Sequence, residues 1–165
     1  VMGLFAYIFI YLLSFLGALG CVLLVAKEER ISTDLIFDLR FMIKANPVVA
    51  WCMVLFMLSM AGIPPTIGFY TKFVILESMV VADLLWLAVF AVLFSVVGAF
   101  YYLRIVKVIL FDGMYLDESV KKVRVSFLSS AFLVINGSTI LIFGLSPDLV
   151  FDPITRLVQF SIYSN

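Results

Sequence analysis

The sequence predicts an all-α integral membrane protein with four transmembrane helices, the second of them broken. Of its 165 residues, 65% are hydrophobic and only 13% are charged, with a mean hydropathy of +1.22. Soluble domains carry about 25% charged residues, and at this length they need a mostly polar exterior. The second observation is that four uncharged stretches each approach or exceed the roughly 20 residues that a helix needs to cross a bilayer.

The charge and residue counts exclude several classes of function. Eleven basic residues balance 11 acidic ones, so the chain has no basic footprint for nucleic acid. With no histidine and two cysteines, the chain is not expected to build a zinc or iron–sulfur site of its own. A soluble enzyme and a disordered tail are excluded by the apolar composition.

The uncharged stretches define the predicted crossings of a single membrane domain, residues 1–165. The first stretch is no signal peptide, because it lacks a basic n-region and an A-x-A-like cleavage site. The spans are expected at about residues 1–26, 47–82, 84–111 and 125–147.

The second span is interrupted by two glycines and two prolines: Gly62, Pro64, Pro65 and Gly68. As one continuous helix its 36 residues would measure about 54 Å, against a hydrocarbon core of about 30 Å. Consecutive prolines remove backbone donors, so a continuous helix is costly there. The chain therefore forms either two spans joined by a tight turn or one span broken inside the membrane.

The distribution of basic residues favours one broken span. With four crossings, nine of the 11 lysines and arginines collect on one side and only Arg156 lies opposite. If residues 47–82 instead form two spans, the chain has five crossings. The same nine residues then divide four against five between the two sides, and the difference in positive charge disappears. The positive-inside rule then predicts that both ends of the chain face outward.

The connecting segments fit four crossings. A short inner surface helix is expected at about residues 34–45, with an apolar stripe of Leu35, Leu39 and Met42. Asn46 followed by Pro47 is typical of an N-cap and the first turn of a helix. The tail, residues 148–165, is expected to lie along the outer membrane surface.

Lys72 is the residue most indicative of function. Eleven residues of helix separate it from Asp83 at the outer end, which places it about 16 Å deep. An ammonium at that depth costs at least about 2.5–3.5 kcal/mol and needs a partner, water or loss of its proton. A proton or ion pathway is the favoured interpretation; a lysine that only pairs with a neighbouring helix during assembly is the alternative.

Three other polar positions have simpler readings. Glu77 points about 140° away from Lys72 on a helix, so it is not an obvious partner for it. It serves either as a proton exit or as one side of an interhelical hydrogen bond. Asn136 is typical of an interhelical hydrogen bond within the membrane, and the small-residue patch around Ser14 and Gly17 is typical of close helix packing.

Two motifs carry a family resemblance: AGIPPTIGFYTKF, Ala61 to Phe73, and FYYLRIVKVILFD, Phe100 to Asp112. They resemble the C-terminal part of subunit 2 of NADH:ubiquinone oxidoreductase (respiratory complex I), most closely its mitochondrial members. IYLLSFLGALG from Ile10 and LSPDLV from Leu145 agree with it.

The resemblance implies that the chain corresponds to about helices eleven to fourteen of an antiporter-like bundle, with 47–82 as the broken helix. Lys72 then corresponds to the broken-helix lysine of the central hydrophilic axis, a relay for protons driven by quinone reduction elsewhere. FMN, iron–sulfur clusters and the ubiquinone site are expected in other subunits, with no cofactor or metal bound by this chain.

The resemblance also implies partners and a location. The partners expected are membrane lipids, other membrane subunits of the complex and a separate chain supplying the N-terminal helices of a split subunit. The location expected is the mitochondrial inner membrane, with the basic loops on the matrix side, or else a bacterial inner membrane. Two other functions stay open: a structural membrane subunit without a proton path, and part of a related cation/proton antiporter or membrane-bound hydrogenase.

Overall fold

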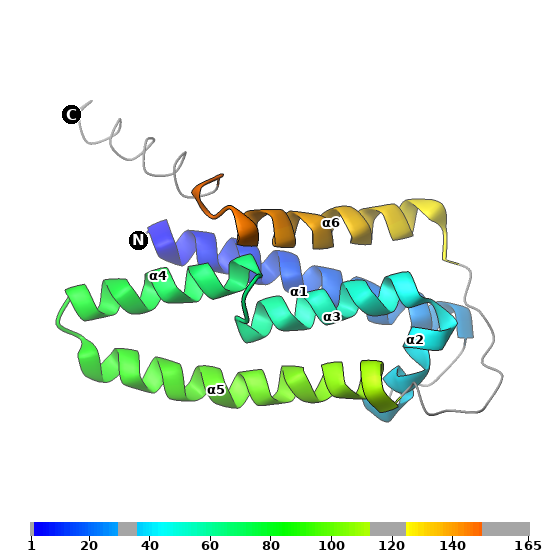
Figure 1. The fold of residues 1–165 in the computed structure, drawn as a ribbon, viewed down its shortest axis with the longest axis horizontal. Coiled ribbons are helices and arrows are strands. Elements are labelled where there is room, and N and C mark those ends of the chain that lie inside the picture. The colour runs from blue at the N-terminus through cyan, green and yellow to red at the C-terminus, as the bar shows by residue number, and fades with distance from the viewer. Residues whose placement is uncertain (1, 30–35, 113–124, 150–165) are drawn as a thin grey trace.

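The computed structural model describes residues 2–29, 36–112 and 125–149 (Figure 1). Within them the chain forms helices only, in the order α1 (Met2–Glu29), η1 (Ile36–Phe41), α2 (Met42–Ala45), α3 (Pro47–Ala61), α4 (Ile67–Val81), α5 (Leu85–Lys107), η2 (Val108–Asp112) and α6 (Phe127–Leu145). The predicted outer tail from residue 150 onward lies outside the described residues, as do Leu35 and five of the basic residues counted above: Arg30, Lys121, Lys122, Arg124 and Arg156.

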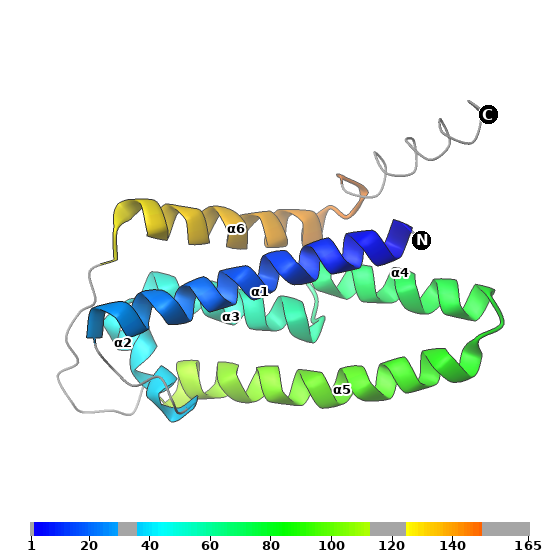
Figure 2. The same ribbon diagram turned by 180° about the vertical axis from the view of Figure 1, so that it is seen from behind.

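The long helices lie side by side, with the pair α3 and α4 in the middle of the bundle (Figures 1 and 2). Helix α1 packs against both members of this pair, α6 covers one side of it, and α5 runs along the other side. Three described stretches are long and apolar enough to cross a membrane on their own: Gly3–Ala26, Leu85–Asp112 and Phe127–Leu145. The fourth crossing is made by α3 and α4 together, so the predicted broken span is confirmed.

The break follows from local backbone chemistry at both of its ends. Helix α3 ends at Gly62, whose φ of 78° lies in the left-handed region that glycine adopts without a Cβ clash. The amide of Ile63 donates to the carbonyl of Leu58 at 3.1 Å, which is the bond of a Schellman cap. Pro64 and Pro65 cannot donate backbone hydrogen bonds, and α4 begins only two residues later.

The start of α3 also confirms the sequence prediction. Asn46 has an extended backbone, and its side-chain oxygen accepts the amide of Val49 at 3.3 Å. Pro47 occupies the first turn, where no backbone donor is needed. The cap and the proline therefore set where the broken span begins.

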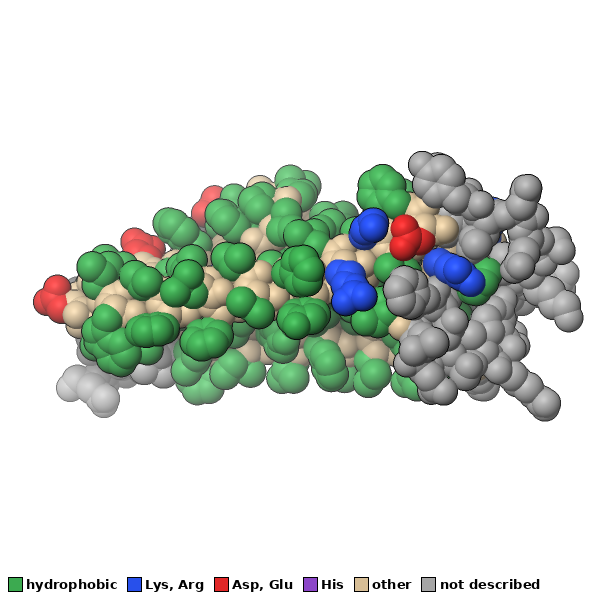
Figure 3. Space-filling model, turned by 90° about the horizontal axis from the view of Figure 1, so that it is seen from below, with side chains coloured by type: hydrophobic (Ala, Val, Ile, Leu, Met, Phe, Trp, Pro, Cys, Tyr) green, Lys and Arg blue, Asp and Glu red, His purple; other side chains and the backbone are tan. Residues whose placement is uncertain are grey.

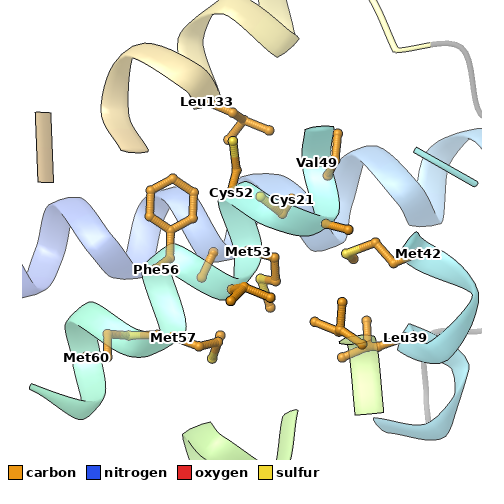
Figure 4. Packing of buried hydrophobic residues seen from close by; sticks show 14 of the residues in the cluster. Cys21, Leu39, Met42, Val49, Cys52, Met53, Phe56, Met57, Met60 and Leu133 are labelled. Atoms are coloured by element: carbon orange, nitrogen blue, oxygen red, sulfur yellow. The ribbon is translucent and has the colours of Figure 1, made fainter. Parts of the chain in front are cut away.

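The core of the bundle surrounds α3 and is rich in sulfur (Figure 4). Met53, Phe56 and Met60 are at most 4% exposed. The ring of Phe56 lies directly over Gly17 of α1. A Cβ added at that glycine would come within 2.7 Å of the ring, so a larger residue would not fit there. The predicted small-residue patch on α1 thus permits close packing, as expected for membrane helices.

Helix α5 has the opposite character, since Ala88 is its one buried residue. Figure 3, seen from the α5 side, shows apolar side chains over most of the visible face. The lysines and arginines that are visible on this face lie toward one end of it. Such a surface suits hydrocarbon tails or the helices of neighbouring subunits.

The inner connecting segment differs from the single surface helix predicted at 34–45. It is a 3₁₀ turn, η1, followed by one turn of α-helix, α2. Leu39 and Met42, predicted to face the membrane surface, are instead 9% and 1% exposed and belong to the core. The segment packs on η2 and α3, and this tertiary contact supplies the apolar partner that an isolated surface helix would find in lipid.

Candidate functional site

Lys72 lies in the second turn of α4, directly after the break in the span. Its side chain is half-buried, and Nζ donates to two oxygens: the backbone carbonyl of Ala61 at 2.9 Å and Oγ of Ser95 at 3.0 Å. Nine residues of helix separate Lys72 from Val81, a rise of about 14 Å. Lys72 therefore lies well inside the span from the end of α4, and its ammonium has protein partners there.

The Ala61 carbonyl is available because α3 ends there. The last carbonyls of a helix have no partner within it, and together they carry a partial negative charge. In α3 the carbonyls of Leu58 and Ser59 accept the amide of Gly62, whereas that of Ala61 accepts the lysine. The break thus creates an acceptor for a cation inside the membrane span.

Gly62 has a second role besides its backbone conformation. A Cβ added there would lie 2.7 Å from Cδ of Lys72 and 3.2 Å from its Nζ. The aliphatic stem of the lysine therefore crosses directly over this glycine. Gly62, one of the predicted break residues, and Lys72, the predicted relay residue, therefore pack directly against each other.

Ser95, on α5, was not singled out from the sequence. It is the single serine in the otherwise apolar stretch 84–103, and that isolation was the available signal. A lone hydroxyl in a membrane span is often used for an interhelical hydrogen bond. Here it joins α5 to Lys72 across the bundle.

A cavity of about 440 Å³ lies beside this hydrogen-bonded lysine, between α1, α4 and α5. Its polar lining consists of Lys72, Ser95 and three tyrosines: Tyr7, Tyr11 and Tyr102. The hydroxyls of Tyr11 and Tyr102 are 3.0 Å apart and bridge α1 to α5. The remaining walls of the cavity are apolar, so water in it can form hydrogen bonds only with this small set of polar side chains.

The other predicted site residues have different surroundings. Glu77 is exposed on α4, and Lys72 makes both of its hydrogen bonds elsewhere, as the helical angle between them predicted. Pro64 and Pro65 are exposed at the break. Gly68 is buried where α4 leaves the break, and a Cβ there would collide with the backbone carbonyl of Ser59. Its lack of a side chain lets the two half-helices overlap.

A second close contact, not predicted, comes from α6. A Cβ at Gly144 would meet the carbonyl oxygen of Pro65 and come within 2.7 Å of the amide nitrogen of Ile67. Asn136, on the same helix, is 6% exposed and donates its side-chain amide to the carbonyl of Leu13 on α1 at 3.2 Å, which confirms the predicted interhelical hydrogen bond. Helix α6 therefore holds the break in place from the side opposite α5.

Metal-binding potential is low in the part of the chain that the structure describes. No group of three or more histidine, cysteine, aspartate or glutamate side chains comes together there. Cys21 and Cys52 are both buried free thiols in the packed core around α3. The chemistry that the described site offers is that of a cation held by neutral oxygens.

Comparison with known proteins gives concordant results. Residues 1–98 match the family described as "NADH:quinone oxidoreductase/Mrp antiporter, TM". NADH-quinone oxidoreductase subunit N of Cupriavidus taiwanensis is 43% identical over 137 residues, covering 83% of this chain and 27% of the relative. The corresponding subunit of Nitrosomonas europaea is 38% identical over 156 residues, covering 94% of this chain and 32% of the relative.

A solved structure supports the same grouping. A chain in respiratory complex I from Thermus thermophilus with bound aureothin superimposes with a TM-score of 0.68 at 28% identity. The match covers 86% of this chain and 32% of that one. The chain thus spans about a third of the length of the relatives it matches.

Proposed function

Because this chain belongs to the NADH:quinone oxidoreductase/Mrp antiporter transmembrane family, we propose that it forms the C-terminal part of an antiporter-like membrane subunit of respiratory complex I. In this role it contributes to proton translocation coupled to electron transfer from NADH to ubiquinone. The observation that carries the proposal is Lys72, an ammonium at the break of a membrane span, bonded to Ala61 and Ser95 and bordering a cavity.

The proposed mechanism assigns this chain a proton-relay residue and no redox step. Lys72 binds and releases a proton while the Ala61 carbonyl and the Ser95 hydroxyl hold its nitrogen in one place. The cavity beside it has room for water, through which a proton can reach the lysine. FMN, iron–sulfur clusters and ubiquinone are proposed to bind in other subunits.

Glu77 is the proposed proton exit. It is exposed on α4 and lies four residues before the end of that helix, about 6 Å from it. A carboxylate so close to the outer end of the span can exchange protons with interfacial water. An interhelical hydrogen bond with a neighbouring subunit is the second reading of the same exposure.

The proposed partners are the other membrane subunits of the complex and membrane lipids. Two features support partners: the exposed apolar face of α5 and the open cavity at Lys72. The proposed location is the inner membrane of a mitochondrion, with the basic loops on the matrix side. A bacterial inner membrane is the second candidate, and the relatives reported above are bacterial.

The orientation is testable by labelling. Four described basic residues belong to the inner end: Arg40 in η1, Lys44 in α2, and Arg104 and Lys107 in the last turn of α5. Their positive charge supports that end as the matrix side. A cysteine introduced at Lys44 should react with a membrane-impermeant thiol reagent from that side in sealed vesicles. Reaction from the opposite side would overturn the proposed topology.

The relay role is tested by substituting Lys72 in the assembled complex. Lys72→Ala removes the proton carrier, and Lys72→Arg keeps a charge that cannot deprotonate in practice. Both variants should assemble yet pump fewer protons, with NADH oxidation falling as well if coupling is tight. Lys107→Ala, which removes an exposed lysine at the inner end of α5, is the matched control.

The same experiment separates the competing functions. A Lys72→Ala complex with an unchanged rate and an unchanged proton stoichiometry would leave the structural-subunit reading standing. The family description also covers Mrp antiporters, so a related cation/proton antiporter is the other candidate. NADH-oxidising subunits that copurify with the chain favour complex I over that candidate.

A further inference from the structure

A second and much smaller cavity lies beside Lys72 and is lined by residues of α1, α3 and α4. Its volume of about 10 Å³ is at the lower limit of the space that can hold a single water molecule. Its lining includes three buried hydroxyl residues, Ser14, Ser59 and Thr71, which are at most 3% exposed. The cavity therefore brings hydroxyl groups and an ammonium group together away from bulk solvent.

The protons of these three hydroxyls are already committed within the protein. Ser14 Oγ donates to the carbonyl of Ile10 at 3.0 Å, so in the 2.9 Å contact between Ser14 and Ser59 the donor is Ser59. Thr71 Oγ1 donates to the carbonyl of Gly68 at 3.1 Å. Each hydroxyl has one proton and two lone pairs, so what the three residues still offer is acceptor capacity.

The ammonium of Lys72 has the complementary need. It carries three N–H donors, of which Ala61 O and Ser95 Oγ accept two. A water molecule in the small cavity can accept the third N–H and donate its own two protons to hydroxyl lone pairs. All donors of the lysine and both protons of the water then have acceptors, as buried polar groups require.

We propose that this cavity is a single-water site, in which Ser59 and Thr71 position a water molecule that completes the hydrogen bonding of the Lys72 ammonium. The inference rests on the proposed relay role for its functional meaning and on the cavity and the hydrogen bonds for its existence. It gives Lys72 a polar neighbour among α1, α3 and α4, in addition to Ser95 on α5. Ser59 and Thr71 are positioning residues in this scheme, since they act on the lysine through the water.

The first test is a cryo-EM map of the intact complex at a resolution that shows ordered water. Density is expected within hydrogen-bonding distance of Lys72 Nζ and of the Ser59 or Thr71 oxygen. A map that resolves waters elsewhere in this subunit but shows none at this position overturns the proposal, and this result needs no variant.

The second test uses an isosteric pair at Thr71. Thr71→Val removes the hydroxyl and keeps the volume, whereas Thr71→Ser keeps the hydroxyl. Loss of one hydrogen bond should lower the proton-pumping rate of the Val variant by about two- to tenfold, and the Ser variant should retain most of it. Thr139→Val is the matched control, because that hydroxyl donates to the Ile135 carbonyl of its own helix at 2.8 Å.

The outcomes distinguish this inference from the relay proposal. If Thr71→Val pumps like Thr139→Val while Lys72→Ala fails to pump, the water site is wrong and the relay role stands. If Lys72→Ala pumps normally, the relay role fails, and the density in the map alone decides whether the water site exists.

Discussion

Replacing Gly62 by alanine tests whether the break and the lysine form one functional unit. The φ of 78° at this position costs an L-residue about 1–2 kcal/mol, a factor of about five to thirty in the population of the native break. The added Cβ would also lie 2.7 Å from Cδ of Lys72, so the lysine stem must move. Displacing Nζ weakens two hydrogen bonds from a charged group, each worth about 1.5–3 kcal/mol.

The expected result is a complex that assembles in reduced amount and pumps several-fold fewer protons per NADH. The measurement is NADH-driven proton uptake in sealed inverted vesicles, normalised to the amount of assembled complex on a native gel. Gly98→Ala is the control: it borders the same cavity, and its Cβ would meet only Tyr102 at an ordinary distance of 3.9 Å. If Gly62→Ala matches both wild type and Gly98→Ala in assembly and pumping, the coupling of break and lysine is refuted.

Three further substitutions test the contacts around the site. Ser95→Ala should lower pumping by about tenfold or more through loss of a charged hydrogen bond, and Ser95→Thr should restore most of it; equal pumping by both variants would contradict this. Gly144→Ala should reduce the amount of assembled complex on a native gel, because the added Cβ meets the backbone carbonyl of Pro65, which cannot move as a side chain can. Assembly equal to that of wild type would show that α6 does not hold the break. Tyr102→Phe removes the 3.0 Å hydrogen bond to Tyr11 and should lower the stability of the complex by about 0.5–1.5 kcal/mol, measured as a slightly lower melting temperature. An unchanged melting temperature would mean that this hydrogen bond does not contribute to stability.

Much of the fold is predictable because membrane constraints are local and additive. The lack of charge over about 20 residues identifies a span whatever its neighbours, since lipid is the reference environment. Gly62, Pro64 and Pro65 interrupt the second span through backbone sterics and missing donors, and these act within a few residues. The capping of α3 by Asn46 is equally local.

The inner connecting segment shows where such reasoning ends. Leu39 and Met42 form an apolar stripe, and an apolar stripe next to a membrane predicts a helix lying on the surface. The structure buries both residues in the bundle, in a 3₁₀ turn followed by a single α-helical turn. Lipid and protein both offer an apolar partner, so the sequence pattern alone cannot choose between them.

The candidate site likewise has features that the sequence predicts and features that only the tertiary structure shows. The sequence by itself determined that Lys72 is deep in a broken span and faces away from Glu77, because the helical rise and the angle per residue are constant. The tertiary structure alone decided which oxygens meet the ammonium: the carbonyl of Ala61, freed by the end of α3, and the hydroxyl of Ser95 on a different helix. Those partners depend on how α4 is rotated and how closely it approaches α3 and α5, and these are set by packing contacts such as that between Gly68 and Ser59. Contacts between helices depend on the shapes of both surfaces at once, and a periodicity read along one helix carries information about only one of them.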